Sequence, residues 1–294
     1  NGIVVAVLGQ LGSPTEIKRF MMWIAANRSN KLSDEGREFL FTDAEIRAGM
    51  QLNEGHLADG SSRRERYRKA FDEFQEYRDD VLAIAEQSGV TVVAGMFRPA
   101  DADADHRVTN TLLAVGRGVD THYDKIHLYD AFGFSESKTV APGREPVVIT
   151  VDGDAGPVTV GLTLCYDIRF PELYIALADL GAELITAHAS WGSGPGKLDQ
   201  WNLLARARAI DTSSIVAAVG QAYPGDEIAA AGPTGVGGSL VASALGEVLA
   251  SAGADPQLLI HDVDLEAARK ARTTVAVMSN RSDFTHPGKA QSLR

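Results

Sequence analysis

The sequence of 294 residues contains a single cysteine and no long apolar run. One cysteine cannot form a disulfide within the chain, so we expect a reducing compartment and a cytoplasmic location. The first apolar segment, Ile3–Leu8, is far too short to span a membrane, and we expect no membrane partner. Low-complexity linkers and internal repeats are also missing. Their absence predicts a single domain over residues 1–294.

Positive charge is scarce, because 28 Lys and Arg residues stand against 39 Asp and Glu residues and give a net charge of −11. A surface of this charge repels phosphate backbones, so we expect no nucleic-acid partner. The basic run that begins at Arg63 is mixed with acidic residues and is interpreted as a solvated helix face. The histidines show no metal-ligand spacing, and we expect neither a metal nor another cofactor.

Apolar runs of strand length alternate with segments of helical period along the whole chain. This alternation predicts a layered α/β fold. We expect strands at Ile3–Leu8, Thr91–Met96, Thr109–Val115, Val119–Tyr123, Val147–Val151, Val158–Leu164, Glu183–Ala187, Ile215–Val219, Gly238–Ala242, Glu247–Ala250 and Leu258–Val263. We expect helices at Thr15–Ala26, Arg64–Gln87, Pro171–Leu180, Leu198–Ile210 and Leu265–Val275.

Two connections can be interpreted from their glycines. Residues 116–118, Gly-Arg-Gly, form a short turn that predicts a hairpin between two of the expected strands, because glycine permits a positive φ. Residues 222–238 are rich in Gly, Ala and Pro but have expected strands on both sides. This stretch is therefore interpreted as a long loop near a site and not as a domain boundary.

The single cysteine, Cys165, stands where the alternation of the strand Val158–Leu164 stops. Pro171 then begins a helical segment, and Gly181 ends it. A strand, a tight turn and a helix thus place Cys165 at a strand end, where its side chain can face a cleft. A buried structural thiol is the alternative. The polar residues that directly follow are unusual for a plain core position: Tyr166, Asp167, Arg169 and Glu172.

The segment from Cys165 to Leu173, CYDIRFPEL, resembles the nucleophile motif of the nitrilase (carbon–nitrogen hydrolase) superfamily. The segment Tyr123–Leu128 resembles the lysine motif of that superfamily, and Glu136–Gly143 resembles the segment that follows it. Residues 206–211 and 238–247 match further landmarks in the same order. Within the superfamily, the likeness is closest to the omega-amidase and deaminated glutathione amidase branch.

This resemblance implies a four-layer α-β-β-α sandwich and an amidase that acts on small linear amides. It implies hydrolysis of a non-peptide C–N bond through a thioester on Cys165. Lys125 and the backbone N–H of Tyr166 would hold the oxyanion, and Glu136 would position the substrate and the lysine. It also implies pairing into a homodimer or a larger homo-oligomer through the helices after Cys165 and near Leu198–Ile210.

The catalytic base departs from the superfamily pattern, in which an early apolar strand ends in Phe-Pro-Glu. The nearest match here is Phe39–Asp43, FLFTD, which puts Asp43 in place of the glutamate. Aspartate is one methylene shorter, and a misplacement of about 1 Å can cost roughly a hundredfold in rate. Glu45, two residues further on, is the other candidate if the turn is reshaped.

Two aromatic residues are candidates for substrate contact. Trp191 follows the expected strand Glu183–Ala187 and should lie at the same edge as Cys165, where it would either wall the pocket or simply pack. Tyr166, next to the thiol, has the same two interpretations.

Two other functions remain open. A catalytically impaired binding or scaffold protein on the same fold would follow from loss of the glutamate. A Cys–His mechanism would use His122, His127 or His188.

Overall fold

The fold is given by a computed structural model that describes residues 3–8, 78–100, 107–131, 133–153, 156–223 and 235–282. The expected helix Thr15–Ala26, the basic run at Arg63, and Asp43 and Glu45 lie outside these residues. Of the expected helix Arg64–Gln87, the described part is helical at residues 78–88.

A six-stranded sheet forms the centre of the molecule, in the order β12-β11-β10-β9-β8-β7. The inner strands β8, β9 and β10 run parallel, and the flanking pairs are antiparallel. Parallel strands are usually covered on both faces, which agrees with the burial of consecutive residues along β9 and β10. The bounds are β7 Val148–Gly153, β8 Gly156–Leu164, β9 Leu184–Ala189, β10 Ile215–Gly220, β11 Leu240–Ala242 and β12 Val248–Ser251.

A second β layer packs against this sheet. It contains the antiparallel strands β2 (Val92–Pro99), β3 (Val108–Gly116) and β4 (Val119–Asp124), and the antiparallel pair β1 (Ile3–Leu8) with β13 (Leu258–Val263). Successive residues of a strand point to opposite faces, and β3 is buried on both. Its residues Leu112 and Ala114 belong to the core shared with β8, whereas Leu113 and Val115 pack against residues 81–85 of the helix.

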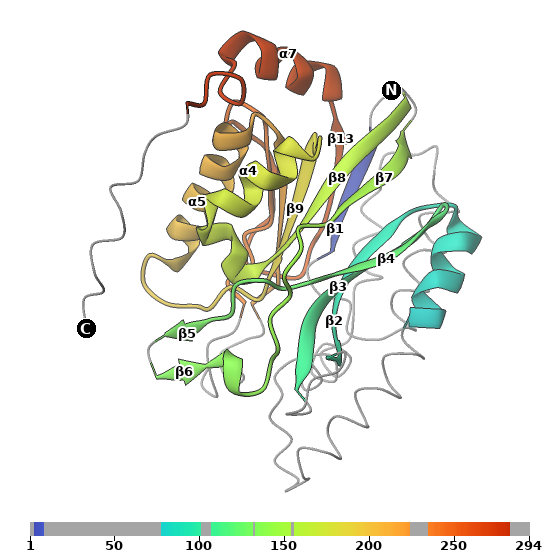
Figure 1. The fold of residues 1–294 in the computed structure, drawn as a ribbon, viewed down its shortest axis with the longest axis vertical. Helices are drawn as coiled ribbons and strands as arrows, with labels where there is room; N and C mark the ends of the chain where they lie inside the picture. The colour runs from blue at the N-terminus through green and yellow to red at the C-terminus, as the bar shows by residue number, and fades with distance from the viewer. Residues whose placement is uncertain are drawn as a thin grey trace, which may run out of the picture.

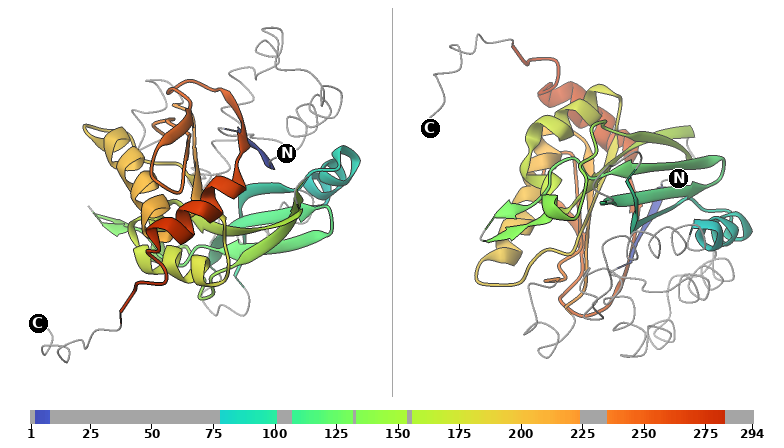
Figure 2. Two further views of the ribbon diagram at one scale, coloured as in Figure 1. Left: turned by 90° about the horizontal axis from the view of Figure 1, so that it is seen from above. Right: turned by 60° about the horizontal axis from the view of Figure 1, so that its bottom comes forward.

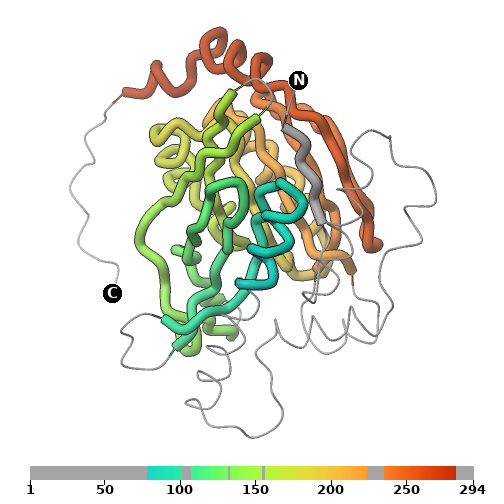
Figure 3. The backbone as a smooth tube through the Cα atoms, turned by 90° about the vertical axis from the view of Figure 1, so that its right-hand side faces the viewer, coloured from blue at the N-terminus to red at the C-terminus, as the bar shows by residue number. Residues whose placement is uncertain are grey.

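Helices cover both outer faces. Helices α4 (Pro171–Asp179) and α5 (Lys197–Thr212) lie on the six-stranded sheet, and the helix at residues 78–88 lies on the opposite side of the molecule (Figures 1 and 2). In Figure 3, which is seen from the right-hand side of Figure 1, this second helix (cyan) lies on the side facing the viewer. Helix α7 (Leu265–Val275) follows β13. The predicted four-layer α-β-β-α sandwich is therefore confirmed.

The glycine-rich turn between β3 and β4 forms the expected hairpin. Gly116 pairs with Val119, so only Arg117 and Gly118 make the turn, and both have positive φ (52° and 82°). Two positive φ values in a two-residue loop match the twist of the flanking strands. Gly116 also has a positive φ (104°), and a Cβ there would lie 2.2 Å from the carbonyl oxygen of Val90.

Several short elements were not expected from the sequence. Strands β5 (Asp130–Ala131) and β6 (Phe134–Ser135) have two residues each, and η2 (Glu136–Lys138) is a 3₁₀ turn. The tight turn expected after Leu164 is present as the 3₁₀ turn η3 (Cys165–Arg169). Strand β11 is shorter than expected because Gly238 has a φ of 68° and stays outside the sheet. Within the described ranges, no helix is long and apolar enough to cross a membrane.

Candidate active site

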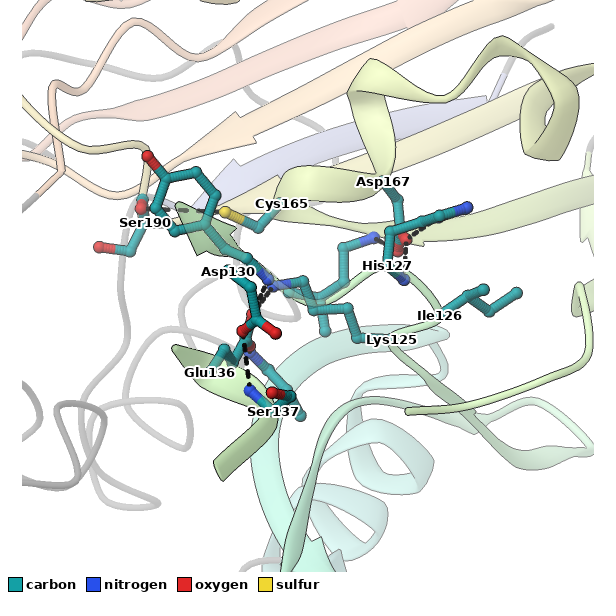
Figure 4. A network of polar contacts seen from close by, with 12 residues as sticks. Lys125, Ile126, His127, Asp130, Glu136, Ser137, Cys165, Asp167 and Ser190 are labelled. Carbon is teal, nitrogen blue, oxygen red and sulfur yellow. Dashed lines mark hydrogen bonds and ion pairs between the residues drawn. The ribbon is translucent and has the colours of Figure 1, made fainter. Parts of the chain in front are cut away.

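The ends of two parallel strands bring Cys165 and the segment after β9 together. Leu164, the last residue of β8, is in register with His188 of β9, so both strands end at the same edge. The Sγ atom of Cys165 lies 4.0 Å from the carbonyl oxygen of Ser190. The expectation that these two segments share an edge is confirmed, and the network around them is drawn in Figure 4.

Cys165 stands on a strained turn between β8 and α4. Its φ is 52°, in the left-handed region that residues other than glycine rarely adopt. The 3₁₀ turn η3 begins at this residue, and α4 begins at Pro171 as the sequence predicts. Such strain persists only where the surroundings over-determine the conformation, and it is concentrated at functional sites.

Lys125 and Glu136 form a buried ion pair beside the thiol. The Lys125 Nζ atom donates to Glu136 Oε2 over 2.6 Å, and the two residues are only 2% and 8% exposed. The backbone N–H of Tyr129 donates to the same carboxylate oxygen (2.7 Å). The side chain of Asn110 donates to the other oxygen (3.4 Å). These donors hold the carboxylate, which in turn fixes the ammonium (Figure 4).

The backbone around Lys125 is held by a close approach of Gly143. The N–H of Gly143 donates to the carbonyl oxygen of Lys125 over 2.8 Å. A Cβ at Gly143 would lie 2.1 Å from the carbonyl oxygen of Asp124, so no larger residue fits without moving the lysine segment. This contact gives a physical reason for the glycine that ends the Glu136–Gly143 motif.

The Cys165 thiol is partly buried, and its pKa is raised. Burial is the largest cause. The ammonium of Lys125 lowers the pKa, while the carboxylates of Glu136 and Asp167 raise it. A hydrogen bond from the backbone N–H of Tyr166 also lowers the thiol pKa. The resting thiol is therefore protonated at neutral pH and needs a base before it can attack.

A carboxylate outside the expected site set, Asp167, connects the two halves of the site. Asp167 is fully buried and accepts hydrogen bonds from the Tyr123 hydroxyl (2.6 Å), the backbone N–H of Leu164 (3.0 Å) and the backbone N–H of His127 (3.0 Å). The ring atom His127 Nδ1 lies 2.8 Å from Asp167 Oδ1. The polar sequence after the cysteine was the only signal for this residue.

The two aromatic candidates have different surroundings. Tyr166 is partly buried and makes an edge contact with the ring of Tyr129, at 5.0 Å between centroids. Trp191 is 5% exposed, packs against Trp201 and donates its indole N–H to the carbonyl oxygen of Lys197. The guanidinium of Arg169 covers the Trp191 ring at 5.1 Å. These contacts are packing contacts, and a substrate contact by either ring stays a prediction.

The three histidines of the Cys–His alternative make no hydrogen bond to the thiol within the part of the chain that the structure describes. His127 bonds Asp167 and stacks on Phe170 with 3.7 Å between ring centroids. His122 is exposed on β4. Burial lowers the pKa of His188 to about 4, so this ring is neutral at physiological pH.

The predicted base and part of one nearby loop lie outside the residues that the structure describes. Asp43 and Glu45 lie outside the described residues, so the choice between them stays a prediction. The loop expected at residues 222–238 lies between β10 and β11, as predicted, and residues 224–234 of it are also outside the description. A bridge between Gly235 and Gly192 brings its end beside the Trp191 segment.

The described residues form a four-layer α-β-β-α sandwich with a cysteine at the end of a central strand, beside a buried lysine–glutamate pair. A family model described as carbon-nitrogen hydrolase matches residues 57–273. The chain therefore belongs to the carbon–nitrogen hydrolase family. Hydrolysis of a carbon–nitrogen bond is the class of reaction that this membership supports.

Similar proteins agree with this assignment. A Mycobacterium tuberculosis protein named hydrolase Rv0480c is 60% identical over 225 residues, which cover 74% of this chain and 78% of that protein. The deaminated glutathione amidase of Escherichia coli O157:H7 is 37% identical over 177 residues, covering 60% of this chain and 63% of the amidase. A carbon–nitrogen hydrolase structure from Helicobacter pylori superposes with a TM-score of 0.69 at 21% identity, covering 96% of each chain. It shares the fold.

Proposed function

We propose that the chain hydrolyses a non-peptide C–N bond in a small linear amide through a thioester on Cys165. The observation that carries the proposal is the thiol on its strained turn, within the electrostatic reach of the buried Lys125–Glu136 pair. A relative named deaminated glutathione amidase supports a small amide as the substrate class.

The first step is formation of the thioester. A carboxylate, Asp43 or Glu45, takes the thiol proton, and the sulfur of Cys165 attacks the carbonyl carbon. The carbonyl electron pair moves to oxygen, where the Lys125 ammonium and the Tyr166 N–H stabilise the negative charge. When the pair returns, the C–N bond breaks and the carboxylate gives its proton to the departing ammonia.

The second step releases the acid. The same carboxylate takes a proton from water, the resulting hydroxide attacks the thioester carbonyl, and the C–S bond breaks. The thiolate of Cys165 then takes up the proton held by the carboxylate. Burial favours this neutral thiol, because it raises the thiol pKa.

Ammonia release from a panel of small amides, including omega-amides of dicarboxylic acids, tests the proposal. We expect release by the wild type, none by Cys165→Ala, and hydroxamate in place of part of the acid when hydroxylamine is added to intercept the thioester. Failure of the wild type to release ammonia from any amide of the panel would contradict the proposal and favour the scaffold alternative. Release without hydroxamate would argue against the thioester.

A further inference from the structure

A single buried carboxylate holds both halves of the candidate site. Asp167 is fully buried, and four donor groups surround its two oxygens. Oxygen Oδ1 is shared by the backbone N–H and the ring Nδ1 of His127. Oxygen Oδ2 accepts from the Tyr123 hydroxyl and from the N–H of Leu164. A buried carboxylate is costly unless its oxygens are satisfied in this way.

The donors come from two distant parts of the chain. Leu164 directly precedes Cys165, whereas Tyr123 and His127 stand two residues before and two residues after Lys125. Burial and the charge of Asp167 raise the pKa of Tyr123, so its hydroxyl stays a neutral donor. A carboxylate accepts stronger hydrogen bonds than a neutral group does. The hydrogen bonds of Asp167 therefore hold the nucleophile turn strongly against the lysine segment.

A stacking contact between two rings is a second connection between the nucleophile turn and the lysine segment. The His127 ring stacks on Phe170, 3.7 Å between centroids and 6° between planes. Phe170 directly follows η3, and its N–H donates to the backbone carbonyl of Asp167 over 2.9 Å. The turn that begins at the strained residue Cys165 therefore contacts the lysine segment twice, through Asp167 in its middle and through Phe170 directly after it. Figure 4 shows Cys165, Asp167 and His127 of this arrangement.

We propose that Asp167 is a positioning residue that fixes the Cys165 thiol relative to the Lys125 ammonium by tying the nucleophile turn to Tyr123 and His127. The inference rests on the proposed function, because it assigns Asp167 to the same site. The left-handed conformation of Cys165 would otherwise relax, and the sulfur would leave the geometry that attack requires.

Two tyrosines give a matched test. Tyr123 and Tyr174 are both fully buried, and each hydroxyl has a short hydrogen bond, to Asp167 (2.6 Å) and to Thr163 Oγ1 (2.7 Å) respectively. Tyr123→Phe should lower kcat about tenfold or more, with KM changed less than about twofold, because positioning is lost while the pocket remains. Tyr174→Phe should change kcat by less than about twofold. Asp167→Asn should lower kcat more than Tyr123→Phe does.

Alkylation of the thiol gives a readout that does not need a substrate. Burial keeps the thiol pKa above its ordinary value. If the hydrogen bonds between Asp167 and the lysine segment are weakened, the sulfur becomes more exposed to solvent. Its pKa then returns toward the ordinary range near 8.5. The pH midpoint of iodoacetamide alkylation should therefore fall in Tyr123→Phe and stay at the wild-type value in Tyr174→Phe.

The outcomes separate this inference from the proposed function. Amide hydrolysis by the wild type, together with equal kcat values in Tyr123→Phe and Tyr174→Phe, would overturn the role of Asp167 and leave the proposed function intact. If the wild type hydrolyses no amide, the proposed function fails. The alkylation midpoints then test the role of Asp167 on their own. Equal midpoints in all three proteins would then overturn the role of Asp167, and a lower midpoint in Tyr123→Phe alone would support it.

Discussion

Burial raises the pKa of the Cys165 thiol, while the ammonium of Lys125 lowers it and the carboxylate of Glu136 raises it. Replacement of these two neighbours should therefore move the thiol pKa in opposite directions. We expect Lys125→Met to shift the pH midpoint of thiol alkylation upward, because the larger of the two charge effects is lost. Glu136→Gln should shift it downward. Alkylation rates between pH 6 and pH 11 measure both midpoints.

Ammonia release provides a second measurement for this pair of variants. We expect kcat to fall at least about a hundredfold in both variants. Lys125→Met removes the cation that stabilises the oxyanion, and Glu136→Gln removes the carboxylate that holds this cation in place. Alkylation midpoints that stay at the wild-type value in both variants would show that the thiol does not sense these charges.

His188 of β9 should make the protein less stable in mild acid. Its Nε2 is buried without a hydrogen bond among the described residues, and burial lowers its pKa to about 4. The unfolded chain takes up a proton near pH 6.5, but the folded chain does not, so stability falls as the pH drops from 6.5 toward 4. This histidine should account for about 2 kcal/mol of the stability lost between pH 7 and pH 5.

Urea unfolding at the two pH values tests this effect. His188→Gln should reduce the loss between pH 7 and pH 5, whereas His122→Gln, at an exposed position of β4, should leave the loss as in the wild type. The prediction is wrong if the two variants lose the same stability as the wild type. Retained amide hydrolysis in His188→Gln would also exclude this residue as the base of a Cys–His mechanism.

At the scale of elements, the hairpin of β3 and β4 depends on two glycines for different reasons. Gly116 has a φ of 104° and faces the carbonyl oxygen of Val90, 2.2 Å from where a Cβ would stand. Gly118 has a φ of 82°, but a Cβ there would meet open space. Gly116→Ala should cost about 3 kcal/mol or more, and Gly118→Ala about 1 kcal/mol.

Chemical denaturation of the two variants measures this difference. Because Gly118→Ala introduces only backbone strain, it serves as the control for the steric clash at Gly116. Equal losses of stability in both variants would mean that β3 does not approach Val90 as closely as the structure has it.

The sequence predicted the longer elements well and the shortest ones not at all. Strand β8 and helix α4 agree with the expected ranges because alternation, Pro171 and Gly181 are local signals. Strands β5 and β6 have two residues each, too few to show any period. The sequence predicted a tight turn after β8 but not its contacts, because Asp167 of η3 accepts its hydrogen bond from Tyr123 of β4, far away in the chain.

At the scale of the whole molecule, an exposed apolar patch suggests how copies of the chain pair. The patch comprises Leu203 (67% exposed) and Ile210 (47%), seven residues apart on one face of α5, with Leu245 (55%) and Val248 (48%) beside them. Arg206 of α5 donates to the carbonyl oxygen of Gly246 over 2.6 Å, which joins the helix to the turn before β12. We propose that this patch is the surface of a homodimer.

The mass of the protein in solution, measured by light scattering, tests this proposal. We expect the wild type to be a dimer or a larger assembly and Leu203→Glu to be a monomer, because the change buries an unpaired charge in the interface. Val275→Glu, at an exposed position of α7, should leave the mass unchanged. A monomeric wild type, or an oligomeric Leu203→Glu, would contradict the proposal.

The sequence by itself determined the layered α/β class, the strand that ends at Cys165, and the motifs that contain Lys125 and Glu136. These features are local, because they depend on periodicity and on runs of neighbouring residues. Only the tertiary structure decided that Lys125 and Glu136 form a buried pair beside the thiol and that Asp167 bonds the lysine segment. Residue spacing along the chain gives no distance between segments that are forty residues apart, and the packing of the two sheets sets that distance.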